Sequence, residues 1–165
     1  MALHSPRRKA GYSRMALRAL LVCGAFVFRE GQAACADGEN TSLPLSTPDS
    51  VFSVLADGTV LDLRTNLMWM RCLAGQSLVG NQCSGTARLF DWGQALVAAR
   101  NQSFAGHNDW RVPNVKELLS IAEDRCTGAG LNANLFPVSG AQAVWTSTPA
   151  TVQFPGLLET SWAVQ

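Results

Sequence analysis

Charged residues are scarce in this chain of 165 residues: they make up 15% of it, whereas hydrophobic residues make up 47%. Such a chain is not disordered by composition, because it can bury enough apolar surface to offset the entropy lost on folding. Apolar runs are short as well: Ala19–Phe28 has ten residues, whereas a membrane-spanning helix needs about 20. The sequence therefore predicts one globular domain with a hydrophobic core.

Side chains that bind metals or attack substrates are also few. The chain has 2 histidines, of which His107 alone lies beyond residue 33, and it has no Cys-x-x-Cys pair, so a zinc site is not expected. No Gly-x-Ser-x-Gly motif marks a serine nucleophile, and we interpret His107, near Asp109, as a solvated loop histidine. Asp57 and Asp62 are typical of turns and strand ends rather than of a calcium site. We therefore expect no metal, no cofactor and no catalytic residue.

Basic residues cluster at the N-terminus, ahead of the apolar run. Small residues follow that run in Gly31-Gln32-Ala33, as they do at a cleavage site. This order predicts that residues 1–33 are a signal peptide, and an uncleaved membrane anchor is the alternative. The basic residues ahead of the run are Arg7, Arg8, Lys9, Arg14 and Arg18.

Removal of this leader would change the charge of the chain. Six of the 13 basic residues but only one of the 12 acidic residues lie in residues 1–33, which leaves 7 basic against 11 acidic residues. The mature part then has a net charge of −4, and it lacks the basic footprint of a nucleic-acid-binding protein. We predict a protein that is secreted, periplasmic or on the cell surface, without a stable membrane span after cleavage.

Cysteine usage agrees with export. Besides Cys23 in the leader, the chain has Cys35, Cys72, Cys83 and Cys126. An even number in an exported chain predicts two disulfides, for which three pairings are possible. Cys72 and Cys83 bracket a short polar loop, so we favour a disulfide between them, which leaves Cys35 to join Cys126.

The first part of the mature chain is expected to be extended. Residues 34–50 predict an irregular lead-in that contains two prolines, and residues 51–165 predict the folded domain. Three β-capable stretches come next, with the turn signal Asp57-Gly58 after the first, and they predict an antiparallel meander. The expected strands are residues 51–55, 59–63 and 67–70.

Two helices are expected, each with a capping box at its start. Asp91 and Gln94 form the first box, and Asn114 and Glu117 form the second. The second helix is expected to continue to Asp124, because apolar side chains at helical spacing extend nearly that far. The apolar stripes are Trp92, Ala95, Leu96 and Ala99 in the first helix and Val115, Leu118, Leu119 and Ala122 in the second.

Beyond the second helix the sequence becomes poor in charge. Residues 127–143 predict a long ordered loop, which we interpret as a binding surface that exposes aromatic side chains such as Phe136. Further strands are expected at residues 143–148 and from residue 162 onward.

The mature chain also contains a set of short motifs in a fixed order. They are Thr47-Pro48-Asp49-Ser50, Asp57-Gly58-Thr59-Val60, Asn66-Leu67-Met68-Trp69, Arg71-Cys72, Phe104-Ala105-Gly106, Asp109-Trp110-Arg111-Val112-Pro113-Asn114, Lys116-Glu117-Leu118 and Trp145-Thr146-Ser147-Thr148-Pro149. In combination, over residues 35–165, they resemble the Lcl C-terminal domain family. That family takes its name from the C-terminal domain of a bacterial collagen-like adhesin and was long a domain of unknown function.

The resemblance implies an α+β, C-type-lectin-like fold, in which two helices flank twisted antiparallel sheets. The family normally continues beyond residue 162 into a final strand, so the resemblance also implies that the last strand or strands are missing here and that the domain is C-terminally truncated. In this fold Trp110 would pack in the core, and Arg111 and Glu117 would anchor the helix start. The fold-determining residues that the resemblance implies are Trp110, Arg111, Pro113, Asn114, Glu117 and Trp145.

Members of this family are exported by bacteria, and the founding adhesin domain binds sulfated glycans and forms trimers. The resemblance therefore implies a non-enzymatic binding or adhesion module, able to form oligomers, whose partner is an extracellular glycan or a surface protein. A structural domain without a ligand and a relative of formylglycine-generating enzymes are the alternatives. The enzyme would need reactive cysteines near a metal, whereas disulfides are the better account of the four mature cysteines.

Overall fold

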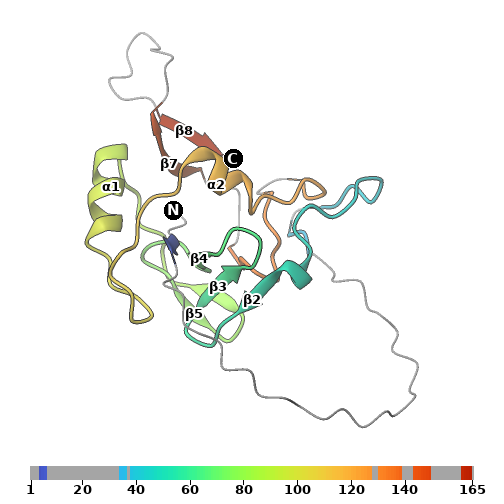
Figure 1. Ribbon diagram of the computed structural model, residues 1–165, viewed down its shortest axis with the longest axis horizontal. Helices are drawn as coiled ribbons and strands as arrows, with labels where there is room; N and C mark the ends of the chain where they lie inside the picture. Colours follow the sequence, from blue (N-terminus) through green and yellow to red (C-terminus); the bar gives the residue numbers. More distant parts are fainter. Residues whose placement is uncertain are drawn as a thin grey trace.

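The computed structural model describes residues 4–6, 34–36, 38–127, 130–138, 143–149 and 161–164 (Figure 1). Over these residues the chain is a mixed α+β protein with two α-helices, small antiparallel sheets and two disulfides. The predicted signal peptide, residues 1–33, lies outside the described residues apart from His4–Pro6. In the described part of the chain, no helix has the length and apolar character needed to cross a bilayer.

A four-stranded antiparallel sheet lies at the centre of the fold. Its strands are β1 (His4–Pro6), β2 (Phe52–Val54), β3 (Thr59–Asp62) and β4 (Leu67–Met70), in the order β1-β4-β3-β2. The predicted meander is confirmed in β2, β3 and β4. Val51 was expected in the first strand but ends a 3₁₀ helix, η1 (Asp49–Val51), because its N–H donates to Pro48 O at 3.1 Å.

The two turns of the meander follow from their residues. Asp57 Oδ1 accepts hydrogen bonds from Thr59 N at 3.0 Å and Thr59 Oγ1 at 2.6 Å. Gly58 has a φ of +86°, and a Cβ there would lie 3.1 Å from Phe104 Cζ, so a larger residue fits neither the backbone nor the space. Asn66, at a φ of +59°, makes the second turn, since asparagine tolerates this conformation.

The hydrophobic core covers both faces of the sheet. All four residues of β3 are buried, which requires cover on both sides because successive side chains point to opposite faces. Full burial of a large apolar side chain contributes about 1.5–3 kcal/mol. The core includes Phe52, Val60, Leu61, Met68, Trp69, Leu73, Ala95, Ala99, Trp110, Leu118, Ile121, Leu135 and Phe136.

Helix α1 (Trp92–Arg100) has the predicted capping box of Asp91 and Gln94. Ala95 and Ala99 are completely buried, and these small side chains allow the helix to lie close to its neighbours. Two indole groups fix its start to β7 (Val144–Pro149): Trp92 Nε1 donates to Thr146 O at 2.9 Å, and Trp145 Nε1 donates to Phe90 O at 2.8 Å. In Figure 1, α1 stands to the left of the central sheet, below the β7–β8 pair.

Helix α2 (Val115–Leu119) has the predicted capping box of Asn114 and Glu117 but is shorter than expected. The prediction that it continues to Asp124 was wrong. Ser120 Oγ donates to Glu117 O at 2.7 Å, and the chain then leaves the helix so that Glu123 N donates to Gly130 O at 2.6 Å. The predicted stripe was therefore wrong in part: Leu119 is 53% exposed, whereas Ile121 takes its place in the core.

Two short hairpin-like pairs complete the structure. β5 (Ser77–Val79) pairs with β6 (Gln82–Ser84), and the sequence did not predict these strands. β7 pairs with β8 (Ser161–Val164), close to the expected positions of the last two strands. Figure 1 also shows that the lead-in, in cyan, and the segment after α2, in orange, lie together to the right of the sheet.

Candidate functional site

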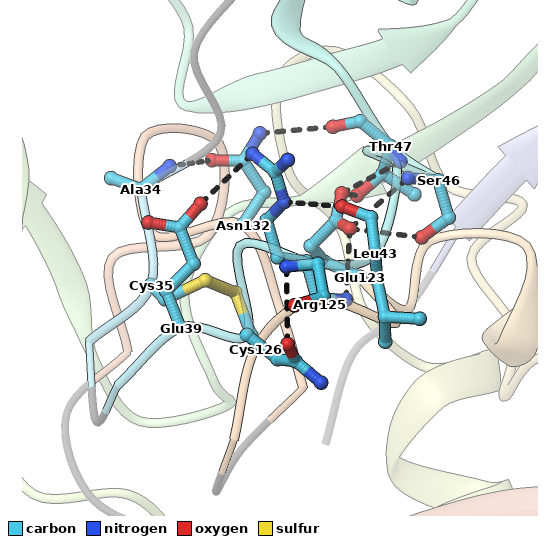
Figure 2. A network of polar contacts seen from close by, with 12 residues as sticks. Ala34, Cys35, Glu39, Leu43, Ser46, Thr47, Glu123, Arg125, Cys126 and Asn132 are labelled. Carbon is cyan, nitrogen blue, oxygen red and sulfur yellow. Dashed lines mark hydrogen bonds and ion pairs between the residues drawn. A yellow bond between two sulfur atoms is a disulfide. The ribbon is translucent and has the colours of Figure 1, made fainter.

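A polar network joins the lead-in to the segment after α2. Its centre is the Glu123 carboxylate, which is 1% exposed. This carboxylate accepts hydrogen bonds from Ser46 N at 3.0 Å, from Thr47 N at 2.7 Å and from Thr47 Oγ1 at 2.8 Å. Arg125 N also donates to it, at 3.1 Å. We call Ser46, Thr47, Glu123, Arg125 and Asn132 the clasp (Figure 2).

Burial and hydrogen bonding act on Glu123 in opposite directions. Desolvation raises the pKa of its carboxyl group, but the hydrogen bonds from Ser46, Thr47 and Arg125 outweigh desolvation and lower the pKa from 4.5 to about 2. The carboxylate is therefore ionised at neutral pH, and protein donors occupy its oxygens. A group in this state does not exchange protons with a substrate near pH 7, so Glu123 serves the fold.

Arg125 and a disulfide extend the clasp along the lead-in. Arg125 Nε donates to Leu43 O at 2.7 Å, and its Nη1 lies 3.0 Å from Glu39 Oε1. The adjacent Cys126 is bonded to Cys35, and Figure 2 shows this disulfide beside the Arg125 contacts. Residues 35–36 and 38–47 are thus held to residues 123–126 by covalent, ionic and hydrogen bonds.

Asn132 ties the segment after Gly130 to the same lead-in. It is fully buried, and its Nδ2 donates to Thr47 O at 3.0 Å and to Asp49 Oδ1 at 2.6 Å. Its Oδ1 accepts from Ala34 N at 3.2 Å. A single amide therefore uses both of its polar atoms to connect three points of the lead-in, which is a structural role.

The structure describes only part of the expected binding surface at residues 127–143, because residues 128–129 and 139–142 lie outside the described residues. The prediction that Phe136 is exposed was wrong: Phe136 and Leu135 are each 2% exposed. The physical reason is that backbone oxygens of this segment are bound by a buried arginine. With its carbonyls held inward, its apolar side chains join the core.

That arginine is Arg71, which directly follows β4 and is 4% exposed. Its Nε donates to Leu135 O at 2.8 Å, and its Nη2 donates to Asn134 O at 2.8 Å and to Asn81 Oδ1 at 2.7 Å. All three acceptors are neutral oxygens. Burial lowers the pKa of Arg71, although a guanidinium stays protonated in proteins. Arg71 thus joins the β5–β6 hairpin to the segment around Leu135.

Replacing Arg71 with methionine is expected to lower the free energy of unfolding by about 2–4 kcal/mol, since three acceptors, of which Leu135 O is buried, lose their donor. Arg71→Lys should recover less than half of this loss, because an ammonium group lacks the planar fork that reaches all three oxygens. Urea unfolding measures both. Arg100→Met, at an exposed position at the end of α1, is the matched control and should change stability by less than about 1 kcal/mol. Equal losses in the Arg71→Met and Arg100→Met variants would contradict the role of Arg71.

The residues implied by the family motif lie around the start of α2. Trp110 is 2% exposed and donates from Nε1 to Phe104 O at 3.2 Å. Arg111 contacts both oxygens of Glu117, at 2.8 and 2.7 Å, while Glu117 Oε2 accepts from Asn114 N at 2.8 Å. These contacts organise the strand-to-helix connection.

Two further motif residues connect the start of α2 to β7. Pro113 O accepts from Ser147 N at 2.7 Å. Trp145 packs against the core and, through the contact with Phe90 described above, reaches α1. The motif residues therefore share one region of the fold, around the start of α2 and its contacts with β7.

Among the described residues, no three His, Cys, Asp or Glu side chains come together in the manner of a metal site. The disulfides are Cys35–Cys126 and Cys72–Cys83, the pairing that the sequence favoured, and they leave no thiol at these four positions. The ring of His107 lies 6.1 Å from that of Trp110 in an edge-on contact.

A further feature is the segment of residues 72–90, which we call the stapled loop: its first residues, Cys72 and Leu73, are buried, and most of the others are exposed or half-buried. Besides the Cys72–Cys83 disulfide, Gln76 Nε2 donates to Gly85 O at 3.3 Å and Arg88 N donates to Ala74 O at 2.8 Å. Its surface combines apolar with hydroxyl and amide groups, and Leu89 and Val79 are 88% and 64% exposed. It contains Arg88 but no acidic residue. Sequence reasoning identified the disulfide here but not the surface it supports.

Comparison with known proteins adds one finding to this geometry. The family model described as the Lcl C-terminal domain matches residues 58–165. The match spans the stapled loop, both helices and Glu123 of the clasp. Neither a curated protein nor a solved structure matches the chain.

Proposed function

Because the chain belongs to the Lcl C-terminal domain family over residues 58–165, we propose that it is an exported, non-enzymatic binding or adhesion module that takes an extracellular glycan. Two disulfides support export, since such bonds form and persist in oxidising compartments outside the cytoplasm. Within this proposal the fold is C-type-lectin-like, with α1 and α2 both lying against β7.

The observation that carries the proposal is the stapled loop. It is exposed, yet its disulfide and cross-loop hydrogen bonds hold it in one conformation, so little entropy is lost when a ligand binds. Its hydroxyl and amide side chains supply the donors and acceptors that sugar hydroxyl groups need. The exposed members of this kind are Ser77, Asn81, Gln82, Ser84 and Thr86.

Charge favours an anionic glycan at this position. The mature chain has a net charge of −4, which repels sulfate groups over most of the surface. The stapled loop is free of acidic residues, and the Arg88 guanidinium lies 5.2 Å from the centroid of the Phe90 ring, which orients it. Arg88 is thus the cation we assign to a sulfate or carboxylate of the ligand.

An array of sulfated and unsulfated glycans, probed with the disulfide-bonded protein, tests this proposal. We expect binding to sulfated members, and we expect Arg88→Gln to weaken it about 10-fold, the effect of losing one charge-assisted hydrogen bond. Arg100→Gln removes the same charge at the exposed end of α1 and should bind like the wild type. Equal losses in both variants would indicate a nonspecific charge effect, and no binding to any glycan would favour a structural domain without a ligand.

A further inference from the structure

Asn81 is an exposed residue that a buried arginine holds in place. It follows Gly80 in the two-residue turn between β5 and β6, where Val79 pairs with Gln82. Its Oδ1 accepts the hydrogen bond from Arg71 Nη2 at 2.7 Å, and because a guanidinium can only donate, the oxygen of the amide must face Arg71. The Asn81 side chain is therefore oriented by a group that is itself 4% exposed.

This anchor leaves the amide nitrogen of Asn81 for a ligand. Nδ2 carries two N–H groups, and among the residues that the structure describes none accepts a hydrogen bond from it. The space beside the turn is open, since a Cβ added to Gly80 would meet no atom within 4 Å. With its oxygen already held, the side chain loses little rotamer entropy when a ligand binds. Asn81 thus offers a pre-oriented pair of donors at the tip of the hairpin.

Stability alone does not explain an amide at this position. The groups that Arg71 contacts are neutral oxygens, so its buried charge has no carboxylate partner in the described part of the chain. A carboxylate in place of the Asn81 amide would accept the same hydrogen bond and pair with that charge. It would lack the two N–H groups, however, and it would bring a negative charge into the stapled loop, which has none. Asparagine therefore suits ligand binding here better than it suits the stability of the fold.

Arg88, assigned above to an anionic group of the ligand, lies at the opposite end of the hairpin. A Cβ on Gly75, two residues before β5, would lie 2.7 Å from Arg88 Cγ, whereas Asn81 comes after β5. The three residues of β5 separate these two ends, which is about 10 Å by the rise per residue of a strand. A single sugar ring does not bridge this distance, so a ligand that meets both residues has several sugar units.

We propose that Asn81 is a ligand-binding residue of the stapled loop, that Arg71 is the positioning residue behind it, and that the loop takes a sulfated oligosaccharide rather than a single sugar. The Asn81 N–H₂ group donates to a sulfate or hydroxyl oxygen of one sugar unit, while Arg88 binds a sulfate on another. This inference rests on the proposed function. It adds the residue that orients the ligand and the length of ligand that the loop takes.

The test measures, by titration calorimetry with the full disulfide-bonded chain, the binding of a heparin fragment of several sugar units and of a sulfated monosaccharide. Asn81→Asp keeps the acceptor for Arg71 but removes the donors. We therefore expect it to bind the heparin fragment about 10-fold more weakly than the wild type, at a urea midpoint no lower than that of the wild type. Asn81→Ala also removes the acceptor, so affinity and midpoint should both fall. Asn108→Asp adds the same charge at an exposed position outside the stapled loop and should bind like the wild type.

Ligand length is tested on the wild type alone, which should bind the monosaccharide at least about 10-fold more weakly than the heparin fragment. A side-chain amide NMR spectrum of the isotope-labelled wild type keeps the role of Asn81 independent of the variants. The heparin fragment should shift the N–H₂ signals of Asn81 and leave those of Asn108 unchanged.

The outcomes separate this inference from the proposed function. Wild-type affinity in Asn81→Asp, equal losses in Asn81→Asp and Asn108→Asp, or unshifted Asn81 signals overturn the role of Asn81, while binding that depends on Arg88 still supports the proposed function. A midpoint of Asn81→Asp as low as that of Asn81→Ala overturns the positioning by Arg71. Equal affinity of the wild type for both ligands overturns the oligosaccharide, and no binding of either ligand overturns the proposed function together with this inference.

Discussion

Replacing both Cys35 and Cys126 with serine is expected to lower the free energy of unfolding by about 4–5 kcal/mol, close to the whole stability of many domains of this size. The disulfide joins residues 91 positions apart, and a cross-link restricts the unfolded chain more when it closes a longer loop. The Cys72–Cys83 disulfide spans 11 positions, and the same relation assigns it about 3 kcal/mol. The lead-in should therefore depend on its disulfide more than the stapled loop does.

Urea unfolding of the two double-serine variants and the wild type, under identical non-reducing conditions, measures this difference. Each variant is the other's control, since both lose one disulfide and gain two hydroxyl groups. The reverse order of stability would contradict the loop-length argument. A loss below about 1 kcal/mol for Cys35→Ser with Cys126→Ser would show that the contacts of Glu123, Arg125 and Asn132 hold the lead-in without the disulfide.

Features set by neighbouring residues could be predicted from the sequence. Both capping boxes are present because an N-cap side chain and the residue three positions later satisfy backbone groups within one turn of helix. The meander follows in the same way from Asp57, Gly58 and Asn66 at its turns. The disulfide pairing could also be inferred, because Cys72 and Cys83 lie close in sequence and leave one other pair.

Features set by distant contacts could not be predicted. Leu118, Leu119 and Ile121 fit a continuous helix as well as a shorter one, and only the contact of Glu123 N with Gly130 O decides where α2 ends. The burial of Phe136 depends on the guanidinium of Arg71, which lies 65 positions earlier in the sequence. A scarcity of charged residues in a loop is compatible with a binding surface and with burial, and at Leu135 and Phe136 it accompanies burial.

Of the two buried charged residues Arg71 and Glu123, which join distant segments, Arg71 did leave a signal in the sequence. Arg71 directly follows the apolar strand Leu67–Met70 and precedes Cys72, so it stands where a buried residue is expected, and a charge there must have specific acceptors. Glu123 left no such signal. It lies between Ala122 and Asp124 in a polar stretch, and its donors at Ser46 and Thr47 lie more than 70 positions earlier.

The second large effect is expected at Glu123. Glu123→Ala should lower the free energy of unfolding by about 3–5 kcal/mol, because the buried donors of Thr47 and the half-buried donors of Ser46 and Arg125 lose their acceptor. A single unsatisfied group costs about 1–3 kcal/mol, and such costs do not add. Glu123→Gln should fall between this variant and the wild type, since its amide keeps one acceptor oxygen but turns an N–H₂ group toward the remaining donors. Asp124→Asn, at an exposed neighbouring carboxylate, should be close to neutral.

The same carboxylate predicts a specific dependence of stability on pH. Its pKa is about 2 in the folded protein against 4.5 in the unfolded reference, so the folded state favours the ionised form. That stabilisation is fully present above pH 4.5 and is lost as the pH falls through about 2. The shift corresponds to about 3 kcal/mol. Between pH 5 and pH 2, the free energy of unfolding of the wild type should therefore fall by about 3 kcal/mol more than that of Glu123→Gln.

Urea unfolding of both proteins at intervals across that pH range gives the two curves, and Asp124→Asn serves as the control for loss of one carboxylate. Its curve should run parallel to that of the wild type, whereas the Glu123→Gln curve should be flatter. Parallel curves for the wild type and Glu123→Gln would mean that donors do not hold this carboxylate ionised. The lead-in would then be stabilised by packing and by the Cys35–Cys126 disulfide rather than by the charge of Glu123. The early end of α2 would also need another cause, because the turn that brings Glu123 to Thr47 would no longer explain it.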